Sequence, residues 1–276
     1  MNRRTALTGL LTLPIASTTV RAAAPLQVVA AQAHYASLAR ELAPGAAVSA
    51  IPIGPAQDPH TFEPGPAVGR ALARAQLVIQ NGLDYDPWLN RLMQARPDNL
   101  LVIATILGRH PGENPHLWYD PIGFEAVTRA LATGLGDDTR LAPTLARFDP
   151  IHARIAALRT AHAGTPVAAT EPVYGLMAQA IGLDMRHTRF QLAVMNGTEP
   201  RVSDVAALES DLRQRQVRIL ITNSQTAGGI TQRVATIAQR AHIPLAPVSE
   251  TMPATVDYQT WLMASLNTLK SALEAA

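Results

Sequence analysis

The fold is decided by one long helical stretch, DTRLAPTLARFDPIHARIAALRTAHA, at residues 138–163. Its apolar residues recur in three- and four-residue steps, the spacing of one face of an α-helix; they are Leu141, Leu145, Phe148, Ile151, Ile155 and Leu158. Because proline removes a helical hydrogen bond, Pro143 and Pro150 predict either one interrupted helix or two. Short apolar strands alternate with helical runs on both sides of this stretch. We therefore predict an α/β protein with two lobes, parallel-type sheets and a cleft between the lobes.

The two lobes are predicted at residues 25–137 and 164–276. The first should contain strands at 26–31, 47–53, 76–81 and 100–104 and helices at 34–42, 66–75 and 87–94. The second should contain strands at 166–170, 185–189, 217–222 and 244–248 and helices at 173–181, 204–215, 231–241 and 258–274. Parallel sheets of this kind bind ligands beyond the carboxyl ends of their strands, so polar residues at those ends are the first candidates for a site.

Residues 1–22 have the pattern of a secretory signal peptide. The basic pair Arg3-Arg4 precedes a small, apolar run that is too short to cross a membrane, and Val20-Arg21-Ala22 is an acceptable cleavage site. The paired arginines are compatible with the twin-arginine (Tat) route as well as the general secretory (Sec) route. Either route predicts export to the periplasm. An uncleaved anchor is the alternative, although Pro14 interrupts the apolar run.

Composition excludes several classes of function. Cleavage after residue 22 would remove three arginines and no acids, which changes the formal charge from +2 to −1. A mature chain with that charge offers no basic stripe for nucleic acid or for an anionic membrane. The chain has no cysteine, which excludes thiolate metal sites and cysteine nucleophiles.

Two short segments share one plan: Asp58-Pro59-His60-Thr61-Phe62-Glu63-Pro64 and Asn114-Pro115-His116-Leu117-Trp118-Tyr119-Asp120-Pro121. The proline before each histidine stiffens the loop, and the acid-proline pair that follows is expected to start a helix. Each histidine should therefore lie on a loop between a strand and a helix, where it could bind a metal. Two chance loop histidines are the alternative interpretation.

Two acids qualify as strand-end residues in the second lobe. Glu171 follows the strand at 166–170, and Glu250 follows the strand at 244–248. Either acid could instead be a helix N-cap or a solvated loop residue. Together with His60 and His116 they would enclose one divalent ion in the cleft, with two ligands from each lobe. Asn223-Ser224-Gln225 also ends a strand and could either hydrogen-bond a ligating carboxylate or simply cap the strand.

At these positions the mature chain resembles the metal-binding subunits of ABC importers for zinc and manganese, the cluster A-I solute-binding proteins. The two proline-histidine motifs carry most of the resemblance. Other matching segments are Val28-Val29-Ala30-Ala31 with Tyr35, Asn81-Gly82-Leu83 with Trp88-Leu89, Thr170-Glu171-Pro172-Val173-Tyr174, Gly182-Leu183, Thr198-Glu199-Pro200, and Tyr258 with Trp261.

The resemblance implies that His60, His116, Glu171 and Glu250 bind one divalent ion as cargo, either Zn²⁺ or Mn²⁺. It implies a monomeric periplasmic receptor that is not an enzyme and that passes the ion to an ABC transporter membrane permease. Many zinc-type relatives have histidine at the position of Glu171, manganese-type relatives have glutamate there, and aspartate is usual at the position of Glu250. Zinc-type relatives commonly have a long histidine-rich loop before the second histidine motif. This chain has only a short loop there, at residues 108–113.

Two other functions use the same residues. An exported zinc metallohydrolase would keep an open position for water, although the chain has no His-Glu-x-x-His run. A soluble metallochaperone would share the site and differ only in its partner. Among the other histidines, His34 could lie near the cleft, but packing in the core or at a helix start is expected. His110 could assist capture of the ion, but a solvated loop residue is expected.

Overall fold

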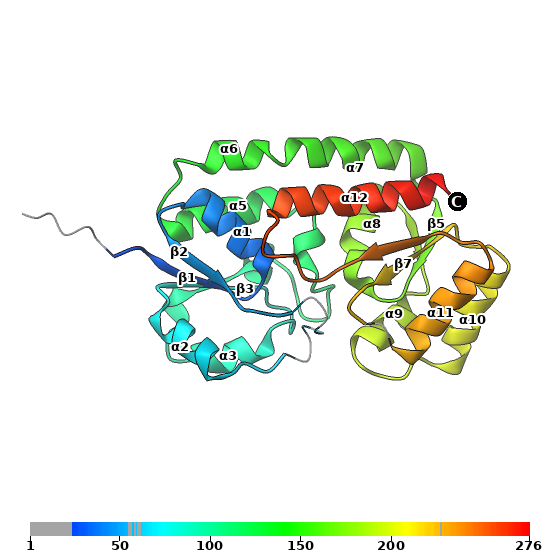
Figure 1. The fold of residues 1–276 in the computed structure, drawn as a ribbon, viewed down its shortest axis with the longest axis horizontal. Coiled ribbons are helices and arrows are strands. Elements are labelled where there is room, and N and C mark those ends of the chain that lie inside the picture. The colour runs from blue at the N-terminus through cyan, green and yellow to red at the C-terminus, as the bar shows by residue number, and fades with distance from the viewer. Residues whose placement is uncertain (1–23, 55–56, 58, 60–61, 227) are drawn as a thin grey trace, which may run out of the picture.

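The computed structural model describes residues 24–54, 57, 59, 62–226 and 228–276. Its first half contains a sheet of four parallel strands in the order β2-β1-β3-β4. These strands are β1 (Gln27–Ala30), β2 (Ala47–Ala50), β3 (Leu77–Gln80) and β4 (Leu100–Val102). The helices of this half are α1 (Ala33–Leu42), α2 (Pro66–Arg74), α3 (Pro87–Met93), α4 (Ile103–Ile106) and α5 (Phe124–Leu135). Figure 1 shows α2 and α3 on one face of the sheet and α1 and α5 on the other.

The second half repeats this strand order in a second parallel sheet, β6-β5-β7-β8. Its strands are β5 (Pro166–Ala169), β6 (Asp184–Arg186), β7 (Ile219–Asn223) and β8 (Leu245–Val248). Its helices are α8 (Gly175–Ile181), α9 (Thr188–Met195), α10 (Val202–Arg213) and α11 (Gly229–Arg240). Two 3₁₀ turns matter for the site: η3 (Leu117–Tyr119) in the first half and η4 (Pro172–Tyr174) in the second.

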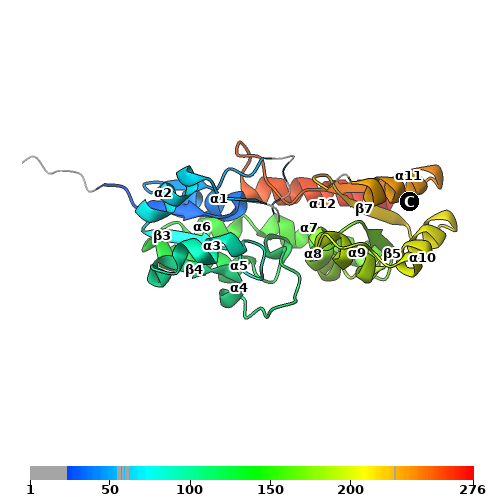
Figure 2. The ribbon, with the colours of Figure 1, turned by 90° about the horizontal axis from the view of Figure 1, so that it is seen from below.

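The predicted connecting helix is two helices, α6 (Leu141–Ala146) and α7 (Asp149–His162). Pro150 lies in the first turn of α7, where the missing N–H costs nothing, so the chain breaks just before it. The last helix, α12 (Tyr258–Glu274), runs beside α7 and also reaches α1 in the first lobe (Figures 1 and 2). Its predicted inner face is buried at Leu262, Leu266, Leu269 and Leu273.

One apolar core runs through both lobes. It includes Val28 and Leu131 of the first lobe, Ile155 of the connecting helix and Ile219 of the second lobe, together with the inner face of α12. A smaller cluster lies under α2 and α3, and another under α10 and α11. The lobes are therefore joined by packing as well as by the chain. Within the described residues, no helix combines the length and the apolarity needed to cross a membrane.

The acid-proline pairs do not start the helices that follow them. Helix α2 begins at Pro66, as its predicted range 66–75 has it, and not at Pro64, because Gly65, directly before a proline, is extended. Helix α5 begins at Phe124 rather than Pro121. The Asp120 carboxylate accepts hydrogen bonds from Arg109 at 2.5 Å and from the N–H of Ile122 at 3.1 Å, and residues 121–123 form a turn.

Candidate metal centre

Three adjacent strands of the second lobe carry polar residues at their carboxyl ends. Glu171 follows β5, Asn223 is the last residue of β7, and Glu250 follows β8. Because β5, β7 and β8 are neighbours in a parallel sheet, these ends meet at one edge. Glu171 and Glu250, the two acids predicted from the sequence, therefore lie on either side of the Asn223 side-chain amide.

The Asn223 side chain connects the two carboxylates. Its Nδ2 donates to Glu250 Oε1 at 2.6 Å and lies 3.4 Å from Glu171 Oε1. The Thr226 hydroxyl also hydrogen-bonds Glu171 Oε1. Glu171 and Glu250 are only 3% and 1% exposed, and buried carboxylates need donors of this kind. Asn223 therefore fixes the spacing of the two acids.

The residue two positions beyond Asn223 orders the loop that carries Glu250. Gln225 Oε1 accepts the N–H of Glu250 at 2.7 Å and the N–H of Thr251 at 2.9 Å. It also accepts the Ser249 hydroxyl at 3.0 Å. The predicted contact between the Asn223-Ser224-Gln225 segment and a candidate carboxylate is thus present, and Gln225 holds the backbone of the same acid.

In the first lobe, hydrogen bonds fix the tautomer of His116. Asn114 Nδ2 donates to the carbonyl of Pro172 at 2.7 Å, and Asn114 Oδ1 accepts the backbone N–H of His116 at 3.0 Å. These contacts orient the amide, so the 2.7 Å contact between His116 Nδ1 and Asn114 Oδ1 places the imidazole proton on Nδ1. In the neutral imidazole, Nε2 is then the nitrogen that can coordinate a metal. It faces Glu250 Oε2 at 3.5 Å, across the boundary between the lobes.

The loop before His116 is itself held rigidly. Asn81 Nδ2 donates to the carbonyl of Pro115 at 2.8 Å, and the Tyr35 hydroxyl donates to Asn81 Oδ1 at 2.6 Å. The His116 ring is fully buried and packs edge-on against Trp118, with ring centroids 5.5 Å apart. A ligand whose orientation is set by hydrogen bonds and packing in this way binds metal more tightly than a free one.

The separation of His116 Nε2 and Glu250 Oε2 suits two ligands of one ion. Metal–ligand bonds of about 2.0–2.2 Å in a tetrahedral arrangement place two ligand atoms about 3.4 Å apart. His60 lies outside the described residues, so the four predicted ligands are not all placed. Among the residues that are described, no three histidines or acids gather closely enough to hold a metal. The structure brings together His116 and Glu250, and links Glu171 to Glu250 through Asn223.

The two other histidines considered from the sequence have different surroundings. His34 is buried and stacks on Trp118, with centroids 5.0 Å apart and planes 3° apart. Burial lowers the pKa of His34 from 6.5 to about 3, so its imidazole is neutral. It lines a cavity of about 20 Å³ together with Tyr85 and Glu250. His110 is exposed.

Three residues near the candidate ligands were not predicted to act there: Tyr85, Asn114 and Thr226. Asn114 belongs to the second histidine motif, and an asparagine two residues before a histidine is a typical local hydrogen-bond partner, so its role could have been found. Tyr85 donates its hydroxyl to Glu250 Oε2 at 3.0 Å from 165 positions away. No local pattern marks that contact.

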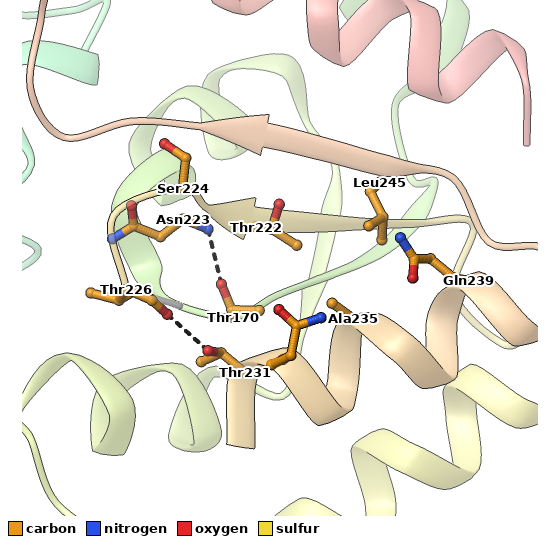
Figure 3. Close-up of a pocket in the computed structure, with 10 residues that line it drawn as sticks. Thr170, Thr222, Asn223, Ser224, Thr226, Thr231, Ala235, Gln239 and Leu245 are labelled. Atoms are coloured by element: carbon orange, nitrogen blue, oxygen red, sulfur yellow. Dashed lines mark hydrogen bonds between the residues drawn. The ribbon is translucent and has the colours of Figure 1, made fainter. Parts of the chain in front are cut away.

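A groove of about 210 Å³ lies beside these hydrogen-bond partners (Figure 3). Thr170, Asn223 and Thr226 lie at one end of it, and Gln239 and Leu245 at the other. Thr170 Oγ1 accepts the N–H of Asn223 at 3.0 Å, which holds β7 against the end of β5. The lining is mostly polar and, among the described residues, uncharged. The groove adjoins the candidate metal centre through Asn223 and Thr226, which hydrogen-bond Glu171, but His116, Glu171 and Glu250 do not line it.

Residues 28–272 match the protein family described as zinc-uptake complex component A, periplasmic. The chain belongs to this family. Zinc-uptake component A proteins are periplasmic solute-binding proteins and not enzymes, so the hydrolase alternative is set aside. The resemblance found in the sequence is confirmed over most of the chain.

Known proteins similar to this family member agree on the fold. A periplasmic zinc-binding protein, TroA from Treponema pallidum, superposes with a TM-score of 0.74 at 17% identity, covering 90% of this chain and 99% of that one. The solute-binding protein FpvC from Pseudomonas aeruginosa, solved in complex with Mn²⁺, has a TM-score of 0.70 at 18% identity, covering 91% and 98%. The predicted α/β fold of two lobes with parallel sheets is thereby confirmed.

One curated relative shares more sequence over a shorter region. The manganese-binding lipoprotein MntA from Halalkalibacterium halodurans is 33% identical over 76 residues. The match covers 25% of this chain and about a quarter of the length of that relative.

Proposed function

We propose that this zinc-uptake component A protein captures one divalent transition-metal ion between its lobes and delivers it to an ABC transporter permease. The ligands would be His60 and His116 from the first lobe and Glu171 and Glu250 from the second. One observation carries the proposal: His116 Nε2 lies 3.5 Å from Oε2 of the buried Glu250 carboxylate in the opposite lobe.

Charge supports a divalent cargo. Glu171 and Glu250 carry two negative charges when ionised, and both are buried. Neutral amide and hydroxyl donors from Asn223, Thr226 and Tyr85 lower the free-energy cost of burying these charges. They do not neutralise the charges themselves. A divalent cation would neutralise both carboxylates.

The donor set admits Zn²⁺ and Mn²⁺. Nitrogen and carboxylate ligands bind both ions, and at most such sites zinc binds more tightly. Two carboxylates harden the site relative to one made of histidines, which favours Mn²⁺. The similar proteins divide in the same way, since TroA is described as zinc-binding, whereas MntA is manganese-binding and FpvC was solved with Mn²⁺.

The signal peptide, the lobe boundaries and the oligomeric state are proposed from the sequence. We assign residues 1–22 to a signal peptide cleaved after export by the Sec or the Tat route. Residues 25–137 and 164–276 form the two lobes, and residues 138–163 connect them. The mature chain is expected to act as a monomer, because the cleft between the lobes of one chain supplies all four ligands.

Metal content tests the proposal. Mature protein freed of metal by chelation would be titrated separately with Zn²⁺ and Mn²⁺ and then with both, and the mass measured under native conditions. We expect one ion per chain, lost in His116→Ala and retained in His110→Ala. Retention of Mn²⁺ against equimolar Zn²⁺ would identify a manganese receptor, and displacement by Zn²⁺ a zinc receptor. Wild-type protein with no stoichiometric ion would contradict the proposal.

A further inference from the structure

A hydrogen bond between the two lobes ends on a candidate ligand. The Tyr85 hydroxyl, in the first lobe, donates to Glu250 Oε2 in the second lobe at 3.0 Å. Both side chains are buried, with 2% and 1% exposure. A hydrogen bond from a neutral donor to a buried carboxylate is among the stronger ones in proteins. The contact therefore contributes both to the position of Glu250 and to the closure of the lobes.

The turn that carries Tyr85 holds its hydroxyl in place. Gly82, Leu83 and Asp84 have φ angles of 84°, 54° and 57°, the left-handed region that non-glycine residues rarely adopt. The turn is closed by Asp86, whose carboxylate accepts the N–H groups of Asn81 at 2.8 Å and Gly82 at 3.0 Å. Strained turns of this kind persist where the surrounding contacts enforce them, and they gather at functional sites.

Packing fixes the Tyr85 ring as well. It meets Trp118 edge-on with ring centroids 4.8 Å apart, and His116 with centroids 5.9 Å apart. Trp118 in turn packs against the His116 ring at 5.5 Å. The tyrosine that donates to Glu250 and the histidine that faces it thus belong to one aromatic cluster.

We propose that Tyr85 is a positioning residue for metal binding that acts through Glu250, an inference that rests on the proposed function. The two carboxylate oxygens of Glu250 have donors from different lobes: Oε1 from Asn223 and Oε2 from Tyr85. These two bonds fix the rotation of the carboxylate. Oε2, the oxygen that lies 3.5 Å from His116 Nε2, is thereby held facing the position that the ion would take between the two side chains.

This arrangement also makes the lobe contact part of metal retention. An ion bound to His116 and Glu250 leaves when these ligands separate, and the Tyr85 hydrogen bond opposes that separation. Removing the hydroxyl should therefore act mainly on dissociation. Loss of a residue that orients a metal ligand typically weakens binding about 10- to 100-fold.

The test compares two tyrosines that both bridge the lobes. The Tyr119 hydroxyl donates to the carbonyl of Ser249 at 2.9 Å, next to Glu250 but not to it. Zn²⁺ dissociation from the mature protein would be timed by stopped flow with an excess of chelator. We expect Tyr85→Phe to raise the dissociation rate about 10- to 100-fold. Tyr119→Phe should change it by less than about threefold, since the ligand keeps its own hydrogen bonds.

A double-mutant cycle separates positioning from general loosening of the interface. In a Glu250→Ala background, Tyr85→Phe should change Zn²⁺ affinity by less than about threefold, because the side chain on which the hydroxyl acts is gone. An equal effect of Tyr85→Phe with and without Glu250, or equal effects of the two tyrosine variants, would overturn the inference and leave the proposed function intact. Wild-type protein that holds no zinc and no manganese would overturn both.

Discussion

The buried histidine beside the candidate metal centre makes the stability of the metal-free protein depend on pH. Both ring nitrogens of His34 lack a hydrogen-bond partner among the described residues, and burial lowers its pKa from 6.5 to about 3. Between these two values the unfolded chain binds a proton at this position and the folded protein does not. The stability contributed by the neutral imidazole is therefore complete above pH 6.5 and is lost progressively as the pH falls towards 3.

The size of the effect follows from the same two values. At pH 5 the unfolded imidazole is 1.5 pH units below its pKa of 6.5, while the folded one is still neutral. At about 1.4 kcal/mol per unit, the free energy of unfolding should be about 2 kcal/mol lower at pH 5 than at pH 7 on account of His34 alone.

The assay is urea denaturation of the metal-free mature protein at pH 7 and at pH 5. The variant His34→Phe keeps an aromatic ring on Trp118 but cannot be protonated, so its loss of stability between the two pH values should be about 2 kcal/mol smaller than that of the wild type. His110→Gln, which alters an exposed histidine, should keep the wild-type loss. Equal losses in the wild type and His34→Phe would refute the reasoning.

Three further outcomes follow from the site and the fold. Asn223→Ala removes the amide that holds both carboxylates and should weaken metal binding about 10- to 100-fold. Competition with a chromogenic chelator measures the affinity, and an unchanged value would mean that the acids keep their spacing without Asn223. His116→Ala should abolish stoichiometric binding while His110→Ala leaves it intact, as read by isothermal titration calorimetry, and equal losses would count against the assigned ligands. Gly82→Ala places a Cβ 2.9 Å from the Cβ of Ala104, at a φ of +84°. It should lower the free energy of unfolding, measured by urea denaturation, by at least about 1 kcal/mol. Gly45→Ala is the control and should not lower it, because nothing lies within 4 Å of the added Cβ.

Most of the fold was predictable because it depends on local patterns. The spacing of apolar residues defined α12 to its last residue and located the eight strands that the described residues form. What the sequence did not indicate is where one element stops and a short one begins. The strand predicted at 185–189 ends at Arg186, because His187 adopts a left-handed φ of 58° and α9 begins directly after it.

Some residues of the candidate site could be predicted from the sequence and others could not. Glu171, Asn223 and Glu250 could be chosen from the sequence because each lies at or just after the carboxyl end of a strand, and parallel strands bring these ends to one edge. The Tyr85 contact could not, since it depends on how the first lobe sits against the second. The acid-proline pair at Asp120 misled for a related reason: its carboxylate binds Arg109 instead of capping a helix.

The central claim is that one ion is held between the lobes by His116 and Glu250 together with Glu171 and His60. The most direct measurement is a crystal structure of the mature protein grown with Zn²⁺ or Mn²⁺, with anomalous diffraction recorded at the absorption edge of the metal. We predict a single strong peak about 2.0–2.3 Å from His116 Nε2 and Glu250 Oε2, with Glu171 and His60 completing the coordination. A peak elsewhere, or none between these residues, would contradict the account.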